Sequence, residues 1–201
     1  MNPLRRHTYH MSLVVISFLY FIYSFIGHTN TPAWMLFSLP AALLWFGLVV
    51  THRYYAFSRM AYFIAFLHIL VMLTGAKYTY STNPLFDMLS ATFDLGRNYF
   101  DRVGHLFQGL TPAIMAYELL LYRSKLKKDW FFYFLIICVS MGISAVYELT
   151  EYLATVVSGY PQAYVLGLQG DNWDTQNDML MALIGSLIGI IISKINTAVR
   201  R

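Results

Sequence analysis

Residues 130–152 read WFFYFLIICVSMGISAVYELTEY, and this stretch decides the fold class. From Trp130 to Val146 every residue is apolar, aromatic or small. A helix needs about 20 predominantly apolar residues to cross the hydrocarbon core of a bilayer. Because no water is present there, the backbone has to satisfy its own hydrogen bonds within a helix. The stretch therefore predicts a transmembrane helix, with two glutamates, Glu148 and Glu151, near its C-terminal end.

Five other stretches are apolar over a comparable length, and they lie at residues 11–27, 33–50, 58–75, 100–122 and 174–193. The composition agrees with them, because 58% of the residues are hydrophobic and only 12% are charged. A soluble domain usually carries about 25% charged residues. The single cysteine excludes a disulfide scaffold. We therefore expect an all-α, polytopic membrane protein in which residues 1–201 form one domain of six transmembrane helices.

The charged residues predict how these helices are oriented. With six spans, 11 of the 14 lysines and arginines fall on one side of the membrane, and the exceptions are Lys77, Arg97 and Arg102. All the acidic residues except Glu118 and Asp129 fall on the other side. Cytoplasmic loops carry the excess of basic residues. We therefore expect both termini in the cytoplasm, in a bacterial inner membrane, and we interpret the net charge of +4 as a sign of topology and not of nucleic-acid binding.

Each of the last three predicted helices carries a polar patch. Asp101 and His105 are four residues apart at the start of residues 100–122, and Glu148 and Glu151 are three apart at the end of residues 130–152. The third patch lies around the start of residues 174–193 and has acids at spacings of three and four, namely Asp171, Asp174 and Asp178. Residues at these spacings share one face of a helix. Each patch is therefore predicted to point in a single direction.

The depth of the patches predicts that they meet. At about 1.5 Å per residue, all three lie within one or two turns of the same, extracytoplasmic membrane surface. A charged side chain at that level is costly unless it faces the bundle interior, water or a cation. Aspartates at helix N-termini are also common caps, and Asp101 and Asp171 fit that role. Asp178 lies too far into its helix to cap it, so one shared, outward-facing pocket is the better interpretation.

The predicted pocket needs a positive partner, because six carboxylates and one imidazole would otherwise repel one another. We expect a divalent metal ion, whose predicted ligands are Asp174, Asp178, Glu148, Glu151 and His105. Oxygen-rich ligation with one histidine favours Mg²⁺, Mn²⁺ or Ca²⁺. Zn²⁺ is less suited, because catalytic zinc usually takes two or three histidines.

The helix predicted at residues 174–193 also carries small residues on one face. Ala182, Gly185 and Gly189 follow one another at spacings of three and four. Small residues in this pattern let two membrane helices approach closely. This face therefore predicts helix packing and not a binding site.

Three segments of the sequence resemble a known family. They are DRVGHLFQG at 101–109, YELTE at 147–151 and QGDNWDTQNDM at 169–179. They are similar to the bacterial inner-membrane family typified by YjdF, which is catalogued as a domain of unknown function. A more distant similarity links the Asp101-to-His105 opening and the Asp-rich start of the last helix to the VanZ-like proteins, some of which are connected with glycopeptide-antibiotic resistance. The resemblance implies an integral inner-membrane protein and supplies no substrate.

Three classes of function fit these features. The first is a metal-assisted enzyme that acts on a lipid headgroup or a lipid-linked envelope substrate, with His105, Asp101 and Glu148 as its catalytic residues. In that hypothesis His105 is a general acid/base or ligand and Asp101 orients it. The second is a proton- or cation-coupled transporter that uses the carboxylates as a relay. The third is a structural or partner-binding membrane protein, in which the acids bind Ca²⁺ or another subunit.

Overall fold

The computed structural model describes residues 3–124, 126–158 and 169–199, and the regular elements within these ranges are all helices. In chain order they are α1 (Pro3–Phe25), α2 (Thr31–Thr51), α3 (Arg59–Tyr78), α4 (Pro84–Phe93), α5 (Phe100–Arg123), α6 (Trp130–Ser158) and α8 (Asp174–Val199). The six predicted spans fall on α1, α2, α3, α5, α6 and α8. The helices extend beyond several predicted limits, because helical hydrogen bonding continues after the apolar pattern ends.

Five of these helices are long and apolar enough to cross a membrane, at Thr8–Phe25, Thr31–Thr51, Arg59–Tyr78, Trp130–Val157 and Asp174–Thr197. Helix α5 is not among them, because polar residues such as His105, Gln108 and Glu118 interrupt its apolar sequence. These three side chains are nevertheless buried in the protein. The polar positions of α5 therefore face neighbouring helices and not the surroundings of the bundle.

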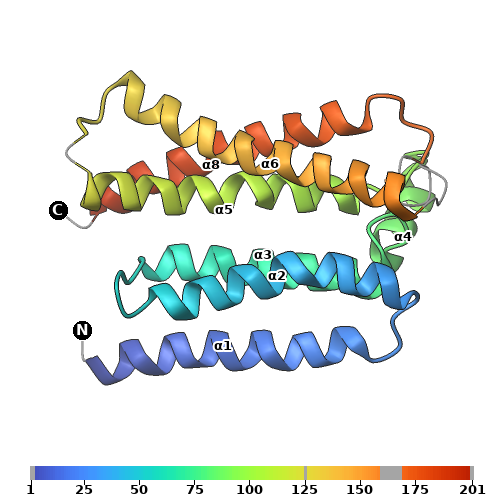
Figure 1. The fold of residues 1–201 in the computed structure, drawn as a ribbon, viewed down its shortest axis with the longest axis horizontal. Helices are drawn as coiled ribbons and strands as arrows, with labels where there is room; N and C mark the ends of the chain where they lie inside the picture. The colour runs from blue at the N-terminus through green and yellow to red at the C-terminus, as the bar shows by residue number, and fades with distance from the viewer. Residues whose placement is uncertain (1–2, 125, 159–168, 200–201) are drawn as a thin grey trace.

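The helices lie in two groups with roughly parallel axes (Figure 1). Helices α5, α6 and α8 form one group, within which α5 and α8 share the most extensive helix contact of the protein. Helices α1, α2 and α3 form the other, and α3 connects the two groups by packing on α5. Helix α1 begins and helix α8 ends on the same side of the bundle (Figure 1). The N-terminal ends of α5 and α8 lie at the opposite side, together with the C-terminal end of α6 (Figure 1).

Glycines allow α5 and α8 to touch backbone to backbone. A Cβ atom added to Gly109 would lie 1.8 Å from the carbonyl oxygen of Ala182, and one added to Gly185 would lie 2.0 Å from that of Leu106. A Cβ at Gly189 would lie 2.9 Å from the Leu110 carbonyl oxygen. The predicted packing role of the small-residue face of α8 is thereby confirmed.

A hydrogen-bonded loop holds the N-terminal end of α5 against that of α8. The Asn98 amide nitrogen donates to Gln169 Oε1 at 2.8 Å, and Gln169 Nε2 donates to the Asn98 carbonyl at 3.0 Å. The Asn98 side chain in turn donates to Asp87 Oδ1 at 2.7 Å and to the Asn83 carbonyl at 2.9 Å. Asn83 caps α4, so this short helix is tied into the same network. Arg97, next in sequence to Asn98, is therefore fixed close to the start of α8.

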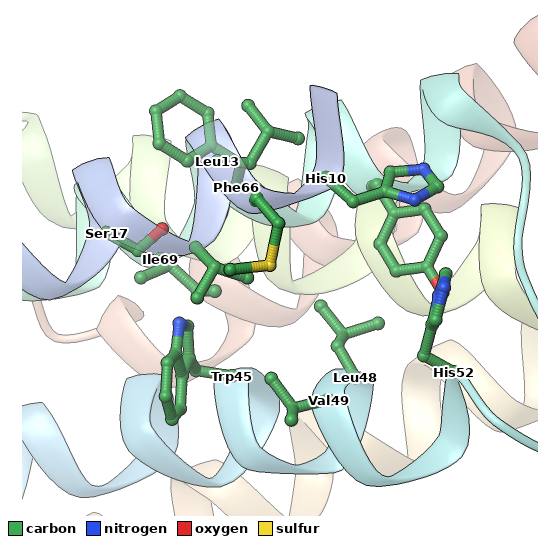
Figure 2. Close-up of a pocket in the computed structure, with 12 residues that line it drawn as sticks. His10, Leu13, Ser17, Trp45, Leu48, Val49, His52, Phe66 and Ile69 are labelled. Carbon is green, nitrogen blue, oxygen red and sulfur yellow. The ribbon is translucent and has the colours of Figure 1, made fainter. Parts of the chain in front are cut away.

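A cavity of about 190 Å³ lies between α1, α2 and α3. Figure 2 shows that Trp45 and Leu48 of α2 face Leu13 and Ser17 of α1 across it. It lies toward the end of the bundle where α1 and α3 begin, because His10 and His52 line it. This is the end opposite to the predicted polar pocket.

Candidate functional site

The predicted polar pocket has its centre at His105. This residue lies in the second turn of α5, one turn after Asp101, while Asp178 lies one turn into α8 and Glu148 lies about three turns before Ser158, the last residue of α6. All four are buried, with exposed fractions of 3% for His105, 7% for Asp101, 2% for Asp178 and 9% for Glu148. The structure therefore brings together residues from three helices, as their depth and spacing predicted.

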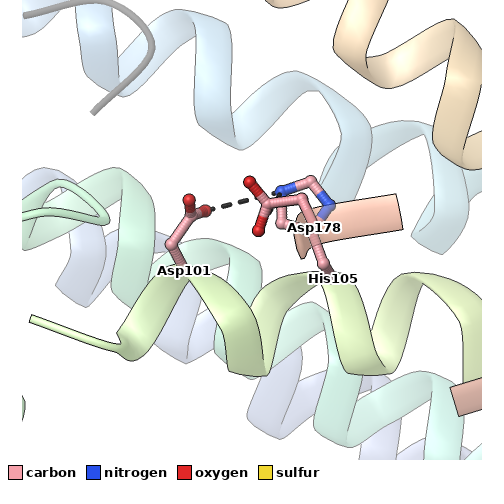
Figure 3. Close-up of side chains that lie close together, drawn as sticks. All are labelled: Asp101, His105 and Asp178. Carbon is pink, nitrogen blue, oxygen red and sulfur yellow. Dashed lines mark ion pairs between the residues drawn. The ribbon is translucent and has the colours of Figure 1, made fainter. Parts of the chain in front are cut away.

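Carboxylates surround both nitrogens of the His105 ring. Nε2 lies 3.5 Å from Asp101 Oδ1 and 3.6 Å from Asp178 Oδ1 (Figure 3). Nδ1 lies 3.5 Å from Glu148 Oε1 and 3.0 Å from Gln108 Oε1. Because an amide oxygen only accepts, Nδ1 donates to Gln108 in this arrangement. Nε2 faces the two aspartates, to which it would donate if protonated, whereas a neutral ring would present its lone pair to a cation there.

Asp101, His105 and Asp178 fit a metal ion by geometry. One ligand atom from each lies within 4.8 Å of the others. For bonds of about 2.1–2.4 Å, neighbouring ligand atoms about 3.5 Å apart subtend roughly 95–115° at an ion, which is an ordinary coordination angle. A hydrogen bond from the other ring nitrogen, here to Gln108, is the usual way in which a ligating histidine is oriented. This three-residue set differs from the predicted ligands, because Asp101 belongs to it.

Two arginines occupy the place that the sequence prediction gave to a metal beside Asp174. Arg102 Nη2 donates to Asp174 Oδ1 at 2.6 Å and to Asp171 Oδ2 at 2.9 Å, and Arg102 Nη1 donates to Asp178 Oδ1. Arg97 Nη1 donates to Asp174 Oδ1 at 2.8 Å and to Asp171 Oδ2 at 3.1 Å. Guanidinium groups thus hold both Asp174 and Asp178, and of these two aspartates Asp178 belongs to the three-residue set. From the sequence, Arg97 and Arg102 were predicted only as basic residues on the acidic side of the membrane.

Asp171 lies in the turn that leads into α8, and its carboxylate accepts hydrogen bonds there. Its Oδ1 accepts the backbone N–H of Trp173 at 2.9 Å, and its Oδ2 accepts Asn177 Nδ2 at 2.9 Å. These two hydrogen bonds, with Arg102 and Arg97 beside them, hold the pKa of the Asp171 carboxyl below its usual value. Asp171 therefore stays charged near neutral pH and fixes the approach of the two arginines to α8.

The two glutamates of α6 take different places. Glu148 Oε1 is buried, and among the described residues it has no hydrogen-bond partner. Glu151 forms no ion pair within 4.0 Å in that same part of the chain, although its carboxylate interacts electrostatically with Asp101 and Glu148. Glu148 is thus directed at the His105 ring, whereas Glu151, which was predicted as a ligand, lies beside the centre.

Two tyrosines that the sequence analysis did not select complete the site. The Tyr147 ring stands edge-on to the His105 ring, with centroids 5.7 Å apart. Tyr80, in the segment after α3, shares a side-chain hydrogen bond with Tyr147. Burial raises the pKa of the Tyr80 phenol well above its usual value, so it remains a neutral donor. Tyr80 lies outside the regular helices and far from the acids in the sequence, so no helical pattern selected it.

The absence of a side chain at two glycines makes room for Tyr80. A Cβ at Gly75 would lie 2.5 Å from the Tyr80 ring, and one at Gly104 would lie 3.0 Å from it. The ring cannot move away easily, because it also stacks on Phe100 at 5.7 Å and meets Phe37 edge-on at 5.2 Å. The two glycines therefore fix the Tyr80 hydroxyl near Tyr147 and the His105 centre.

Replacing Gly75 by alanine should destabilise the protein by about 1–3 kcal/mol, which is the usual cost of overpacking a filled interior. The measurement is the free energy of unfolding in mixed detergent micelles. Gly47→Ala is the matched control, because nothing lies within 4 Å of a Cβ at Gly47 in α2. This control should be neutral or stabilising by up to about 1 kcal/mol. Equal effects of the two substitutions would show that Tyr80 is not held in this way.

Comparisons with known proteins agree with the helical, membrane-length character of the chain. A family model described as "Predicted membrane protein (DUF2238)" matches residues 9–198. The inner membrane protein YjdF of Escherichia coli (strain K12) is 35% identical over 191 residues, which cover 95% of this chain and 90% of that protein. No solved structure matches significantly. The more distant similarity to VanZ-like proteins stays a prediction. These findings support a multi-pass protein of an inner membrane, and the chain belongs to the DUF2238 family of predicted membrane proteins.

Proposed function

We propose that the protein is a membrane-embedded enzyme that acts on a phosphate-bearing lipid headgroup or lipid-linked envelope substrate with the aid of a divalent cation. The observation that carries this proposal is the position of His105. Its buried ring lies within 3.6 Å of carboxylates from α5, α6 and α8. A packed protein interior avoids unpaired charge. A cluster of carboxylates from three helices around one imidazole is therefore more typical of a reactive centre than of a packing contact.

The charge of the surrounding groups supports a bound cation. Six carboxylates lie in or beside the site, and they belong to Asp101, Glu148, Glu151, Asp171, Asp174 and Asp178. Arg97 and Arg102 are the guanidinium groups paired with them in the described residues. With all six carboxylates ionised and His105 neutral, four negative charges have no cationic side chain. A divalent ion on Asp101, His105 and Asp178 would offset half of this excess.

In the proposed topology α5 crosses the membrane together with the five apolar helices, which gives six spans. Both termini lie in the cytoplasm, and the site lies at the extracytoplasmic surface. Helix α5 is 24 residues long and packs against α3, α6 and α8. Its buried polar residues therefore do not prevent it from crossing the bilayer inside the bundle. The basic residues predicted to be cytoplasmic support the orientation. In this topology the site lies one or two turns below the surface, at the level of lipid headgroups.

The unpaired donors of Arg97 favour a substrate that carries a phosphate group. The Arg97 side chain is only 8% exposed, and its Nε and Nη2 atoms are buried with no hydrogen-bond partner in the described residues. The guanidinium fork matches the oxygens of a phosphate. Arg97 would thus bind the phosphate while Nη1 remains on Asp171 and Asp174.

The residues have separate roles in this proposal. His105 would hold the ion through Nε2, while Gln108 accepts from Nδ1–H and fixes the ring. Glu148, whose unpaired Oε1 faces the ring, would take or give the proton of the reacting oxygen. A bound divalent ion would polarise the phosphoryl oxygen or lower the pKa of a bound water.

Reconstituted protein tests the proposal. Vesicles made from the total lipid extract of the host membrane are incubated with the protein, with or without EDTA, and their lipids are analysed by mass spectrometry. We expect conversion of one phosphate-bearing species, inhibition by EDTA, and a loss of about 100-fold or more in His105→Gln. His28→Gln is the control, because His28 lies in the loop between α1 and α2 and bonds only to Phe25 and Thr31 in the described residues.

A transporter would give a different result in the same vesicles. The unpaired Oε1 of Glu148 is the observation that favours a proton or cation relay. Flux of protons or cations that disappears in Glu148→Gln, together with unchanged lipids, would replace the enzymatic proposal. Unchanged lipids without flux would favour the structural or partner-binding alternative.

A further inference from the structure

A groove runs between α1 and α2, on the opposite side of the bundle from α6. The cavity of Figure 2 adjoins a second cavity of about 190 Å³, and both are lined by Ser17, Trp45 and Ile69. Beyond these shared residues the second cavity is bounded by apolar side chains that include Phe21 and Leu73. Helices α1 and α2 make few direct contacts, and α3 forms the floor. The groove therefore has an apolar length suited to a hydrocarbon chain.

One end of the groove is polar. His52 Nδ1 lies 2.6 Å from the Tyr62 hydroxyl, and the His10 ring lies 4.5 Å from the Tyr62 ring and 5.1 Å from the His52 ring. Figure 2 shows His10 and His52 at the same end of the cavity. Two imidazoles and a phenol at the mouth of an apolar groove fit the polar head of an amphiphile.

Basic side chains stand near this end. Arg59 opens α3 one turn before Tyr62, and its guanidinium carbon lies 5.4 Å from the ring of Tyr9, the neighbour of His10. Its Nε is buried with no hydrogen-bond partner among the described residues. Within that same part of the chain no carboxylate lies within 4.0 Å of Arg53 or Arg59. The mouth of the groove is therefore complementary to an anionic head.

Trp45 provides a donor partway along the groove. Its Nε1 is buried and has no hydrogen-bond partner in the described residues, and Figure 2 shows the indole beside the cavity, between α1 and α2. Trp45 is seven residues before His52, about 10 Å along the helix axis. A buried indole N–H usually has an acceptor. The ester carbonyls of a glycerolipid, which lie below its phosphate, are acceptors of this kind.

We propose that this groove binds one anionic glycerophospholipid from the leaflet at the end where α1 begins. One acyl chain lies between α1 and α2, an ester carbonyl accepts from Trp45 Nε1, and the phosphate lies beside Arg59, His10 and His52. The site is independent of the His105 centre, because it lies at the other end of the bundle and uses helices α1, α2 and α3.

Quenching of Trp45 fluorescence by brominated lipids tests the proposal. The chain has four tryptophans, and the triple variant Trp34→Phe, Trp130→Phe, Trp173→Phe keeps only Trp45. The variant is placed in phosphatidylcholine vesicles and titrated with phosphatidylglycerol brominated on its acyl chains, or with equally brominated phosphatidylcholine. We expect half-maximal quenching at a mole fraction about fivefold lower or more for phosphatidylglycerol. This factor corresponds to the roughly 1 kcal/mol expected for one basic side chain near anionic lipid.

The preference for phosphatidylglycerol should vanish in the double variant Arg59→Gln, His52→Gln. It should persist in Arg123→Gln, which changes an exposed arginine at the same end of the bundle. Equal quenching by the two lipids would overturn the proposal, because it would describe ordinary bilayer lipid in the groove. If the tryptophan-depleted variant does not fold, native mass spectrometry of the unaltered protein replaces it. Phosphatidylglycerol that stays bound and is lost in Arg59→Gln, His52→Gln supports the site, and equal retention in both proteins contradicts it.

Discussion

Replacing Arg102 by glutamine should destabilise the folded protein by about 3–5 kcal/mol, which is the typical effect of removing one partner from a buried ion pair. Arg102 bonds to the carboxylates of Asp171, Asp174 and Asp178, and its side chain is 9% exposed. Without it, Arg97 is the remaining cation on Asp171 and Asp174, and Asp178 loses its guanidinium partner. The free energy of unfolding in mixed micelles measures the effect.

Arg123→Gln is the matched control for Arg102→Gln. It changes the last residue of the same helix, which is exposed and has no carboxylate within 4.0 Å in the described residues. We expect a change of less than about 0.5 kcal/mol there. Arg102→Lys should recover only part of the loss, since an ammonium group cannot bond to several carboxylates with the fixed fork of a guanidinium. Equal stability of the two glutamine variants would contradict the ion-pair network.

Replacing Gly109 by alanine should cost about 3 kcal/mol or more, at or above the usual range for overpacking. The added Cβ would lie 1.8 Å from the Ala182 carbonyl oxygen, so the backbones of α5 and α8 must separate. Gly109 is one turn after His105, and Ala182 is one turn after Asp178. Separation at this contact should therefore also move His105 away from Asp178 and weaken any ligand held between them.

Gly142→Ala in α6 is the control for Gly109→Ala, because nothing lies within 4 Å of a Cβ at Gly142. It should be neutral or stabilising by up to about 1 kcal/mol, as helix propensity predicts. Unfolding free energies and metal affinities of the two variants are compared. A Gly109→Ala protein as stable as the Gly142→Ala protein would show that α5 and α8 do not approach as closely as described.

The membrane-length helices were predictable because hydrophobic length is a local property of the sequence. The approach of Asp101, His105, Glu148 and Asp178 was also predictable, since spacing fixes the face of a helix and the distance from the membrane surface fixes depth. The face of α8 that carries small residues indicated close helix packing for a similar reason. In each case a one-dimensional pattern corresponds directly to a position on a helix.

The partners of the acids were not predictable in the same way. Arg97 and Arg102 are 69 to 77 residues away from the aspartates that they bind, and the same acids would have accepted a metal ion equally well. In this structure Asp174 is paired with both arginines, and its assignment as a metal ligand stays a prediction. Asp101 was expected to orient His105, and the structure adds its Oδ1 to the atoms that face Nε2.

Tyr80 escaped prediction for another physical reason. It lies outside the regular helices, so no periodicity marked the direction of its side chain. Its position depends on missing side chains at Gly75 and Gly104, which belong to two different helices. A glycine on a helix face indicates close approach, but the sequence does not say which residue approaches.

Manganese binding to the purified protein tests most directly whether Asp101, His105 and Asp178 form one centre. Electron paramagnetic resonance should detect one bound Mn²⁺ per chain, with coupling to an imidazole nitrogen. The affinity should fall by about tenfold or more in folded His105→Ala and Asp178→Asn proteins, and it should stay unchanged in Asp94→Asn, an exposed acid at the end of α4. No saturable binding, or the same affinity in all three variants, would contradict a common metal centre.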